Sequence, residues 1–166
     1  MYYNLFETGR TRQRGSIEVI CGSMFSGKTE ELLRRLRRAK IAGLQVEIFK
    51  PSLDPRYDEE QVVSHDQNMI PSTPVDHSSN ILLLGSDVDV VGIDEAQFLT
   101  ALQVDQLMEI ALIDDVPVLA YGIRTDFRTV SFPGSRRLLE IAHSLEELKT
   151  ICRCGRKAIF NARKVG

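Results

Sequence analysis

Residues 17–40 constrain the fold of this chain more than any other stretch. An apolar run over residues 17–21 leads into a glycine-rich loop, and strong helix formers with regularly placed leucines follow over residues 30–40. The loop reads Gly-Ser-Met-Phe-Ser-Gly-Lys-Thr and fits the pattern G-x-x-x-x-G-K-[S/T]. A strand, this loop and a helix, in that order, form the context in which the pattern binds phosphate. An ordinary glycine turn before a helix is the alternative, and both flanks argue against it.

Each residue type in the loop has a physical task. The glycines let the backbone curl so that successive N–H groups point at phosphate oxygens. Lys28 supplies a positive charge for the β- and γ-phosphates. Thr29 offers a hydroxyl to Mg²⁺ and opens a helix whose N-terminal dipole favours anions. The predicted nucleotide-binding loop consists of Gly22, Ser23, Met24, Phe25, Ser26, Gly27, Lys28 and Thr29.

Apolar runs continue to alternate with helix-like stretches along the rest of the chain. Further strands are expected over residues 46–50, 88–94, 116–122 and 148–151, with short extended pieces at 62–64 and 68–70. This alternation predicts an α/β domain over residues 15–150, with a mostly parallel sheet flanked by helices. A flexible polar arm over residues 1–14 is expected to precede it.

The helices carry their own start and stop signals. Gly43 is expected to end the helix that follows the glycine loop. Thr100 and Gln103 match a capping box at the start of a later helix. Two more helices are expected over residues 80–84 and 136–142. The buried stripe expected for the helix after Thr100 consists of Leu102, Leu107, Ile110 and Ala111.

The composition argues against several functions. The 166 residues carry 21 Lys and Arg against 23 Asp and Glu, a net charge of −2, so we expect no nucleic-acid partner. The arginine-rich run over residues 34–40 is accordingly interpreted as a solvated helix face. No apolar stretch is long enough to span a membrane, and residues 1–15 lack the apolar core of a signal peptide. With three cysteines, the expected location is the reducing cytoplasm, with Cys21 as a small core residue.

Two adjacent carboxylates follow the strand expected over residues 88–94. Parallel strands present ligands beyond their carboxyl ends, so Asp94 and Glu95 should face the same crevice as the glycine loop. Asp94 would hold Mg²⁺ directly or through water, and Glu95 would act as a general base toward the attacking nucleophile. Water as the nucleophile gives an ATPase, and a substrate hydroxyl gives a kinase. A GTPase is disfavoured because the chain contains no Asn-Lys-x-Asp segment.

Taken in order, the motifs of this chain resemble those of thymidine kinase, of the type shared by bacteria and the animal cytosol (type II). The resemblance covers nearly everything from residue 17 onward, and the ordered set is more specific than any one of its members. The motifs that carry it are the glycine loop with Met24 and Phe25 inside it, Asp54-Pro55-Arg56-Tyr57, Ser64-His65-Asp66, Ile93-Asp94-Glu95-Ala96-Gln97-Phe98, Tyr121-Gly122-Ile123-Arg124-Thr125-Asp126-Phe127-Arg128 and Thr150-Ile151-Cys152-Arg153-Cys154-Gly155-Arg156-Lys157.

The resemblance implies transfer of the ATP γ-phosphate to the 5′-hydroxyl of thymidine on a RecA-like core, for nucleoside salvage. Glu95 is then the base that takes the 5′-hydroxyl proton, and Thr29 and Asp94 serve Mg²⁺. Asp54 and Arg56 lie near the metal and the phosphates, and the family is usually a homotetramer. The implied nucleotide-site segment comprises Asp94, Glu95, Ala96 and Gln97, and the implied thymine pocket comprises Met24, Phe98 and Phe127.

The resemblance also implies a zinc-ribbon-like piece that begins at residues 151–166. Cys152 and Cys154 supply two ligands, whereas a closed structural zinc site needs four. The family places its second ligand pair, and the loop that closes over thymidine, further along the chain than Gly166, so this piece is expected to be truncated. Two alternatives therefore stay open. One is a P-loop ATPase or nucleotide-binding module acting on a partner, and the other is a catalytically impaired fragment that lacks the thymidine lid.

Overall fold

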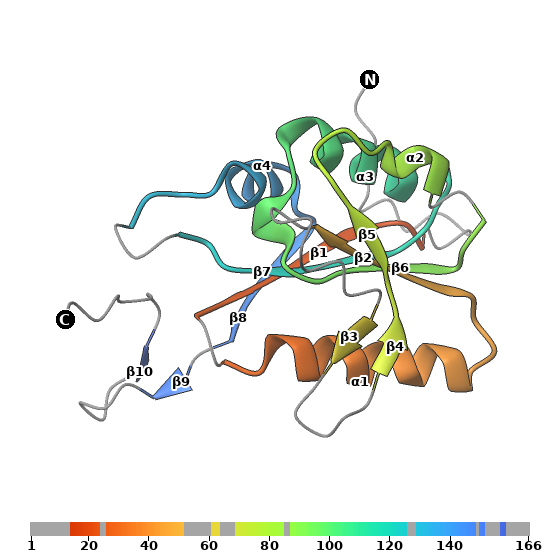
Figure 1. Cartoon of the computed structure of the whole chain (residues 1–166), viewed down its shortest axis with the longest axis horizontal. Coiled ribbons are helices and arrows are strands. Elements are labelled where there is room, and N and C mark those ends of the chain that lie inside the picture. Colours follow the sequence, from red (N-terminus) through yellow and green to blue (C-terminus); the bar gives the residue numbers. More distant parts are fainter. Residues whose placement is uncertain are drawn as a thin grey trace.

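The fold is built on one six-stranded sheet in which every pairing is parallel (Figure 1). The computed structural model describes residues 14–23, 26–51, 61–63, 69–84, 87–125, 129–148, 150–151 and 157–158. The strand order is β5-β2-β6-β7-β1-β8. The strands are β1 (Ile17–Gly22), β2 (Val46–Pro51), β5 (Thr73–Val75), β6 (Val90–Ile93), β7 (Val118–Gly122) and β8 (Ser144–Leu148). The predicted α/β class with a mostly parallel sheet is confirmed.

Helices cover both faces of this sheet (Figure 1). On one face lies α1 (Lys28–Ile41), and on the other lie α2 (Ile81–Leu84), α3 (Ala101–Ile113) and α4 (Pro133–Ile141). A 3-10 turn, η2 (Ala96–Phe98), follows β6. Each face has its own apolar core, and the core beneath α1 contains Leu32, Leu33 and Leu36. No helix in the described part of the chain combines the length and the apolarity needed to cross a membrane.

Two small antiparallel sheets complete the described structure. One pairs β3 (Gln61–Val63) with β4 (Met69–Pro71), which confirms the two short extended pieces predicted in this region. The other pairs β9 (Thr150–Ile151) with β10 (Lys157–Ala158). The proposed domain boundaries at residues 14–15 and 150–151 stay predictions, and residues 1–13 of the arm lie outside the described residues.

The helix signals read from the sequence are confirmed. Gly43 follows α1 with a φ of +83°, the left-handed conformation in which glycine ends helices. The hydroxyl of Thr100 accepts from Gln103 N at 3.1 Å, and Thr100 N donates to Gln103 Oε1 at 3.0 Å. Both halves of the predicted capping box are therefore formed at the start of α3.

Several predicted details were wrong. Residues 148–151 are not one core strand, because β8 ends at Leu148 and Thr150 pairs in another sheet. Since β8 lies at the edge of the main sheet, it is mostly exposed. The side chain of Leu102 is 68% exposed and does not belong to the buried stripe of α3. Helix α4 starts at Pro133 rather than at residue 136, because proline suits the first helical position.

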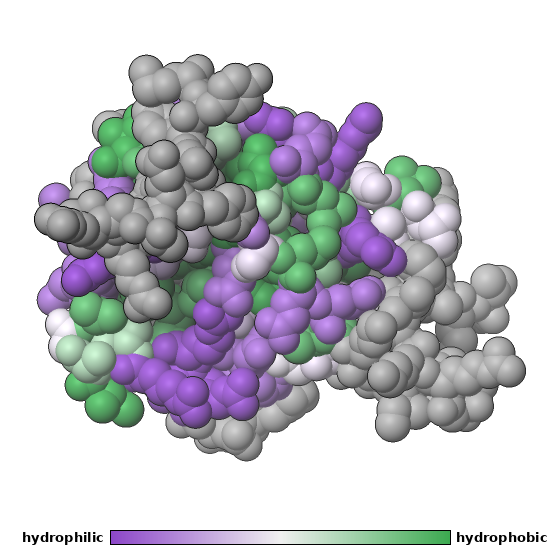
Figure 2. All heavy atoms as spheres, turned by 180° about the vertical axis from the view of Figure 1, so that it is seen from behind, coloured by the Kyte–Doolittle hydropathy of each residue, from purple (hydrophilic) through white to green (hydrophobic). Residues whose placement is uncertain are grey.

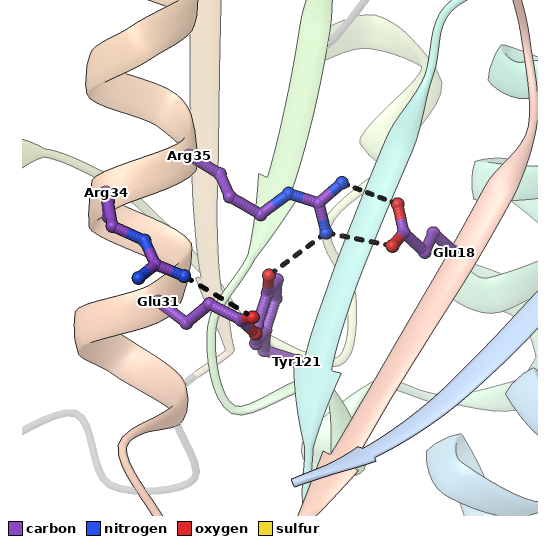
Figure 3. A network of polar contacts seen from close by, with 5 residues as sticks. All are labelled: Glu18, Glu31, Arg34, Arg35 and Tyr121. Atoms are coloured by element: carbon purple, nitrogen blue, oxygen red, sulfur yellow. Dashed lines mark hydrogen bonds and ion pairs between the residues drawn. The ribbon is translucent and has the colours of Figure 1, made fainter.

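The arginine-rich run on α1 is only partly a solvated face. Figure 2 shows hydrophilic residues along the lower part of the molecule, where α1 lies. Arg34, Arg38 and Lys40 of α1 are exposed. Arg35 differs, because its guanidinium turns toward the sheet and donates to both carboxylate oxygens of Glu18 (Figure 3). The interpretation of the arginine-rich run over residues 34–40 as a solvated helix face is therefore wrong at Arg35.

Candidate active site

Three segments meet at the carboxyl edge of the sheet. Strands β6, β7 and β1 are neighbours and run parallel, so their carboxyl ends share one edge. The glycine loop follows β1, the carboxylates of Asp94 and Glu95 follow β6, and Ile123 follows β7. Ligands of open parallel sheets bind outside this edge. The topology thus brings together segments that are about 70 to 100 residues apart in the chain, as expected for a parallel sheet with long crossovers.

The glycine loop closes tightly onto the start of α1. Ser26 N donates to Ser23 O at 3.2 Å, and Glu31 N donates to Gly27 O at 3.1 Å. Gly27 caps the helix with a φ of +84°, a left-handed conformation that side chains disfavour. A Cβ at Gly22 would collide with the hydroxyl of Ser26. Both predicted glycines therefore have a local structural reason; Met24 and Phe25 lie outside the described residues.

Lys28 folds back over this loop. Its Nζ donates to Ser23 O at 2.7 Å, to Gly22 O at 3.0 Å and to Ser26 Oγ at 3.3 Å. Burial lowers the pKa of Lys28, and the carboxylates of Glu95 and Asp94 oppose that shift. The Lys28 ammonium group is thus hydrogen-bonded to backbone carbonyls of the loop and is also attracted electrostatically by the carboxylates of Glu95 and Asp94.

Ser23 adds a buried polar atom to the loop. Its Oγ has no hydrogen-bond partner among the described residues. A buried hydroxyl without a partner costs free energy, so it commonly marks a position where water or a ligand supplies one. The Ser23 hydroxyl is therefore a hydrogen-bond donor that could bind a ligand at the loop.

Asp94 and Thr29 lie next to each other across the edge. The Thr29 hydroxyl is 3.4 Å from Asp94 Oδ1 and 3.5 Å from Oδ2. Asp94 is 6% exposed, and Glu95 N donates to its Oδ1 at 3.1 Å. Burial, followed by the neighbouring Glu95 carboxylate, raises the pKa of Asp94 to about 6, although the charge of Lys50 works against it. A buried carboxylate beside a hydroxyl is a set of hard oxygen donors, which fits a divalent cation such as Mg²⁺.

Glu95 occupies a strained turn between β6 and η2. Its φ is 58°, in the left-handed region that non-glycine residues rarely adopt. Its Oε2 accepts a hydrogen bond from Gln97 Nε2 at 3.0 Å. Gln97 is 2% exposed, and its Oε1 accepts from Ile123 N at 3.1 Å. Strained non-glycine residues cluster at functional sites, which agrees with the predicted role of this position.

The predicted thymine-pocket residues are only partly described. Phe98 is half-buried, and its ring meets Phe132 edge to face with centroids 5.8 Å apart. This packing locates Phe98 beside the base of α4, and its role toward a nucleobase stays a prediction. The predicted site residues that lie outside the described residues are Met24, Phe25, Asp54, Arg56, Phe127, Cys152 and Cys154.

Sequence reasoning missed two contributors to this edge. Lys50 places a positive charge near Asp94, because β2 pairs with β6 and Phe49 lies opposite Ile93 in the register. The amide N–H of Ile123 meets Gln97 from the end of β7. Neither could be found from the sequence, since a strand order is needed to place Lys50 and a backbone amide carries no residue signature.

A parallel sheet that brings a glycine loop, a lysine and two carboxylates to one edge places this chain in the α/β nucleotide-kinase class of folds. The sequence model of the thymidine kinase family matches residues 15–165. The chain belongs to the thymidine kinase family, and it is therefore an enzyme of the kinase class, as its motifs predicted.

Known members of the family are similar over most of the chain. The thymidine kinase of Porphyromonas gingivalis (strain W83) is 59% identical over 157 residues, which cover 92% of this chain and 75% of the relative. That of Bacteroides fragilis (strain YCH46) is 53% identical over 156 residues, or 93% of this chain and 78% of the relative. That of a Rhodothermus species is 49% identical over 150 residues, or 90% and 70%.

Proposed function

We infer that this chain transfers the γ-phosphate of ATP to the 5′-hydroxyl of thymidine, with Glu95 as the general base. The observation that carries the proposal is the single edge at which Lys28, Asp94 and Glu95 lie. Phosphoryl transfer asks a protein chiefly for positioning and for neutralisation of charge, so this short set of groups is nearly sufficient. Membership of the thymidine kinase family supports thymidine as the acceptor.

The phosphate and metal side of the reaction is assigned to α1 and its loop. The loop N–H groups and Lys28 would bind the β- and γ-phosphates, as a RecA-like P-loop does. The Thr29 hydroxyl and the Asp94 carboxylate would hold Mg²⁺, which when bound neutralises charge on the transferring phosphate. Asp54 and Arg56 complete this side of the proposal, on the strength of the family resemblance.

The acceptor side is assigned to Glu95 and its surroundings. Its carboxylate accepts a hydrogen bond from Gln97 through Oε2, so the second oxygen, Oε1, is the one proposed to take the proton of the 5′-hydroxyl. The thymine ring would lie against Met24, Phe98 and Phe127, where aromatic and thioether side chains suit a flat methylated base.

The remaining proposals rest on the resemblance. They are a structural zinc ion with Cys152 and Cys154 among its ligands, a homotetramer, and a role in nucleoside salvage in the cytoplasm. Zinc content per chain by atomic absorption and the mass of the native assembly test the first two directly. Zinc below one equivalent per site, or a monomer at working concentration, contradicts them.

The central test measures dTMP formation from thymidine and Mg-ATP by Glu95→Gln and Lys28→Met. Glu95→Gln should lower kcat by about 10²–10⁴-fold while ATP binding persists, because only the proton transfer is removed. Lys28→Met should weaken ATP binding as well as turnover. Retained turnover in Glu95→Gln would remove it from the role of base. ATP hydrolysis that is indifferent to thymidine would instead favour an ATPase or nucleotide-binding module.

A further inference from the structure

The side-chain amide of Gln97 is buried and makes a hydrogen bond within the protein at each of its two ends. Gln97 is 2% exposed although it lies in the segment predicted to contact nucleotide. One end of its amide reaches Glu95, where Nε2 and Oε2 are 3.0 Å apart. The other end reaches the backbone at the end of β7, where Ile123 N and Oε1 are 3.1 Å apart. The amide therefore bridges the predicted base and the segment that follows a neighbouring strand.

The orientation of this amide is determined by its partners. A backbone N–H can only donate, so the Gln97 atom that faces Ile123 must be the oxygen. The NH₂ group then faces Glu95 and offers it a donor. An ionised carboxylate accepts such a hydrogen bond, and the bond fixes which oxygen is used. Gln97 thus directs one oxygen of the Glu95 carboxylate, Oε2, toward itself.

The bridge is supported by close packing on two sides. A Cβ at Gly122 would lie 2.8 Å from Gln97 Oε1 and 3.0 Å from Gln97 N. A Cβ at Gly134 would lie 2.7 Å from Ala96 O and 3.0 Å from Gln97 O. Because two glycines let β7 and α4 approach this closely, η2 has little room to move. The hydroxyl of Ser135 also donates to Ile123 O, so both the N–H and the carbonyl of Ile123 are hydrogen-bonded to side chains.

The left-handed backbone of Glu95 makes such support necessary. A non-glycine residue in this conformation is strained and persists only where its surroundings determine it. The backbone of the turn is held by hydrogen bonds from Glu95 N to Asp94 Oδ1 and from Phe98 N to Glu95 O, both at 3.1 Å. The Glu95 side chain is held by a further bond, from Gln97 Nε2. Loss of the bond from Gln97 would leave the Glu95 carboxylate free to take other rotamers.

We propose that Gln97 is a positioning residue that holds the Glu95 carboxylate in its reacting orientation and links it to the end of β7 through Ile123. The proposal rests on the assignment of Glu95 as the base. Gln97 acts on the reaction through Glu95 rather than by touching the nucleotide with its amide. Its removal should therefore lower kcat and leave the KM for ATP nearly unchanged.

The experiment uses two buried glutamines of equal exposure. Gln97→Met removes both hydrogen bonds of the bridge with little change in volume. Gln103, also 2% exposed, caps α3 and donates to Asp76 O, and Gln103→Met is the matched control. Gln97→Met should lower kcat by about 10–100-fold with the KM for ATP within about 2-fold, since a misplaced base loses only part of its effect. Gln103→Met should lower Tm and keep kcat.

A double-mutant cycle separates positioning from a general structural role. In the Glu95→Gln background, Gln97→Met should change kcat by less than about 3-fold, because there is no base left to orient. Independent, multiplicative effects would overturn the proposal. Unchanged kcat in Gln97→Met beside an inactive Glu95→Gln would overturn it while sparing the base assignment. Full turnover by Glu95→Gln would overturn both.

A second variant guards against loss of folding. Gln97→Glu keeps the size and an acceptor for Ile123 N–H, but it presents a carboxylate instead of a donor to Glu95. It should lose at least as much kcat as Gln97→Met. Wild-type kcat in this variant would show that the donor to Glu95 is dispensable and would overturn the proposal.

Discussion

The guanidinium of Arg35 on α1 binds both carboxylate oxygens of Glu18 on β1, with distances of 2.9 and 2.7 Å (Figure 3). Its Nη1 also donates to the hydroxyl of Tyr121 on β7 at 3.2 Å. The hydrogen bonds to Glu18 raise the pKa of Arg35, and burial raises the pKa of Tyr121, so both groups stay protonated. One side chain thereby ties the helix behind the glycine loop to two strands of the sheet.

Arg35→Met should destabilise the fold more than Arg34→Met. Loss of Arg35 leaves Glu18 and the Tyr121 hydroxyl without their donor, at an expected cost of about 1–2 kcal/mol for a half-buried charge-assisted pair. Arg34 is the matched control, because its side chain is 63% exposed and lies 3.7 Å from Glu31 on the same helix. Its loss should cost about 0.5 kcal/mol or less. Urea unfolding measures both.

Tyr121→Phe tests the third member of the network. The ring stays in the core while one hydroxyl contact disappears, so the expected cost is about 1 kcal/mol.

The Arg35 prediction has a clear contrary outcome. Equal losses of stability in Arg34→Met and Arg35→Met, or no loss in Arg35→Met, would show that the ion pair between Arg35 and Glu18 contributes nothing to stability.

Gly134→Ala should damage catalysis, whereas Gly43→Ala should not. A Cβ at Gly134 would lie 2.6 Å from Leu99 O and 2.7 Å from Ala96 O, and these backbone carbonyls cannot yield without moving η2. We expect a cost of about 1–3 kcal/mol together with a lower kcat for thymidine phosphorylation, since η2 follows Glu95 directly. A Cβ at Gly43 would meet nothing within 4 Å, although its φ of +83° is unfavourable for alanine.

Gly43→Ala should therefore cost about 1 kcal/mol of stability and leave kcat intact. The measurements are urea unfolding curves and kcat for thymidine phosphorylation, both made on Gly134→Ala and on Gly43→Ala. If Gly134→Ala lost stability but kept its full turnover, the placement of Glu95 would not depend on the contact between α4 and η2.

His143 should make stability depend on pH. Its Nδ1 accepts from Ile17 N at 2.8 Å, and its own N donates to Ile17 O at 2.9 Å. Burial lowers the pKa of His143 below 6.5, so the unfolded chain takes up the proton first as the pH falls. The stability from neutral His143 is therefore present above about pH 6.5 and is lost as the pH falls through its lowered pKa.

The control is His143→Asn, whose side-chain oxygen can accept from Ile17 N without titrating. Its stability should show a weaker decline on acidification when the free energy of unfolding is measured across this range. The same decline in both proteins would mean that other groups cause it.

The sequence could predict the features that are local in the chain. The glycine loop, the Gly43 stop and the Thr100–Gln103 box each depend on residues within a few positions, and a sequence pattern contains all of that information. The alternation of strands and helices similarly sufficed for the α/β class. The features that the sequence could not predict depend on residues that are far apart in the chain but adjacent in the folded structure.

Strand β5 illustrates the first kind of failure. Pro74 argues against a strand in the sequence, yet β5 lies at the edge of the sheet, where a proline is tolerated. Strand β8 failed for a related reason, since an edge strand need not carry the apolar run that marks a buried one. Edge positions are a property of the strand order, which the chain pattern does not contain.

Arg35 and Ile123 illustrate the second kind of failure. Arg35 lies in a run of arginines, and the sequence around it does not distinguish it from the others. What distinguishes Arg35 is its ion pair with Glu18, which lies on the sheet that α1 packs against. Ile123 takes part through its backbone amide, which every non-proline residue has. Predicting either contact requires the packing of α1 or η2 on the sheet.

Asp94 provides the last prediction, because its pH dependence should run opposite to that of His143. Burial raises its pKa from 3.8 to about 6, so the folded protein binds the proton more tightly than the unfolded chain. The stability that comes from this group is present below about pH 3.8 and is lost as the pH rises through about 6. A shift of this size corresponds to about 3 kcal/mol at neutral pH, as an order of magnitude.

Asp94→Asn should therefore be more stable than the wild type at neutral pH, and the difference should vanish in acid. Mg²⁺ should narrow the difference at neutral pH by stabilising only the wild type, because a cation beside Thr29 favours the ionised Asp94 carboxylate. Thermal unfolding with and without Mg²⁺, at pH values on both sides of the Asp94 pKa, measures both effects. Equal stabilisation of the two proteins by Mg²⁺ would show that the ion binds elsewhere. If the wild type were as stable as Asp94→Asn at neutral pH, the Asp94 carboxylate would be better solvated than its burial implies.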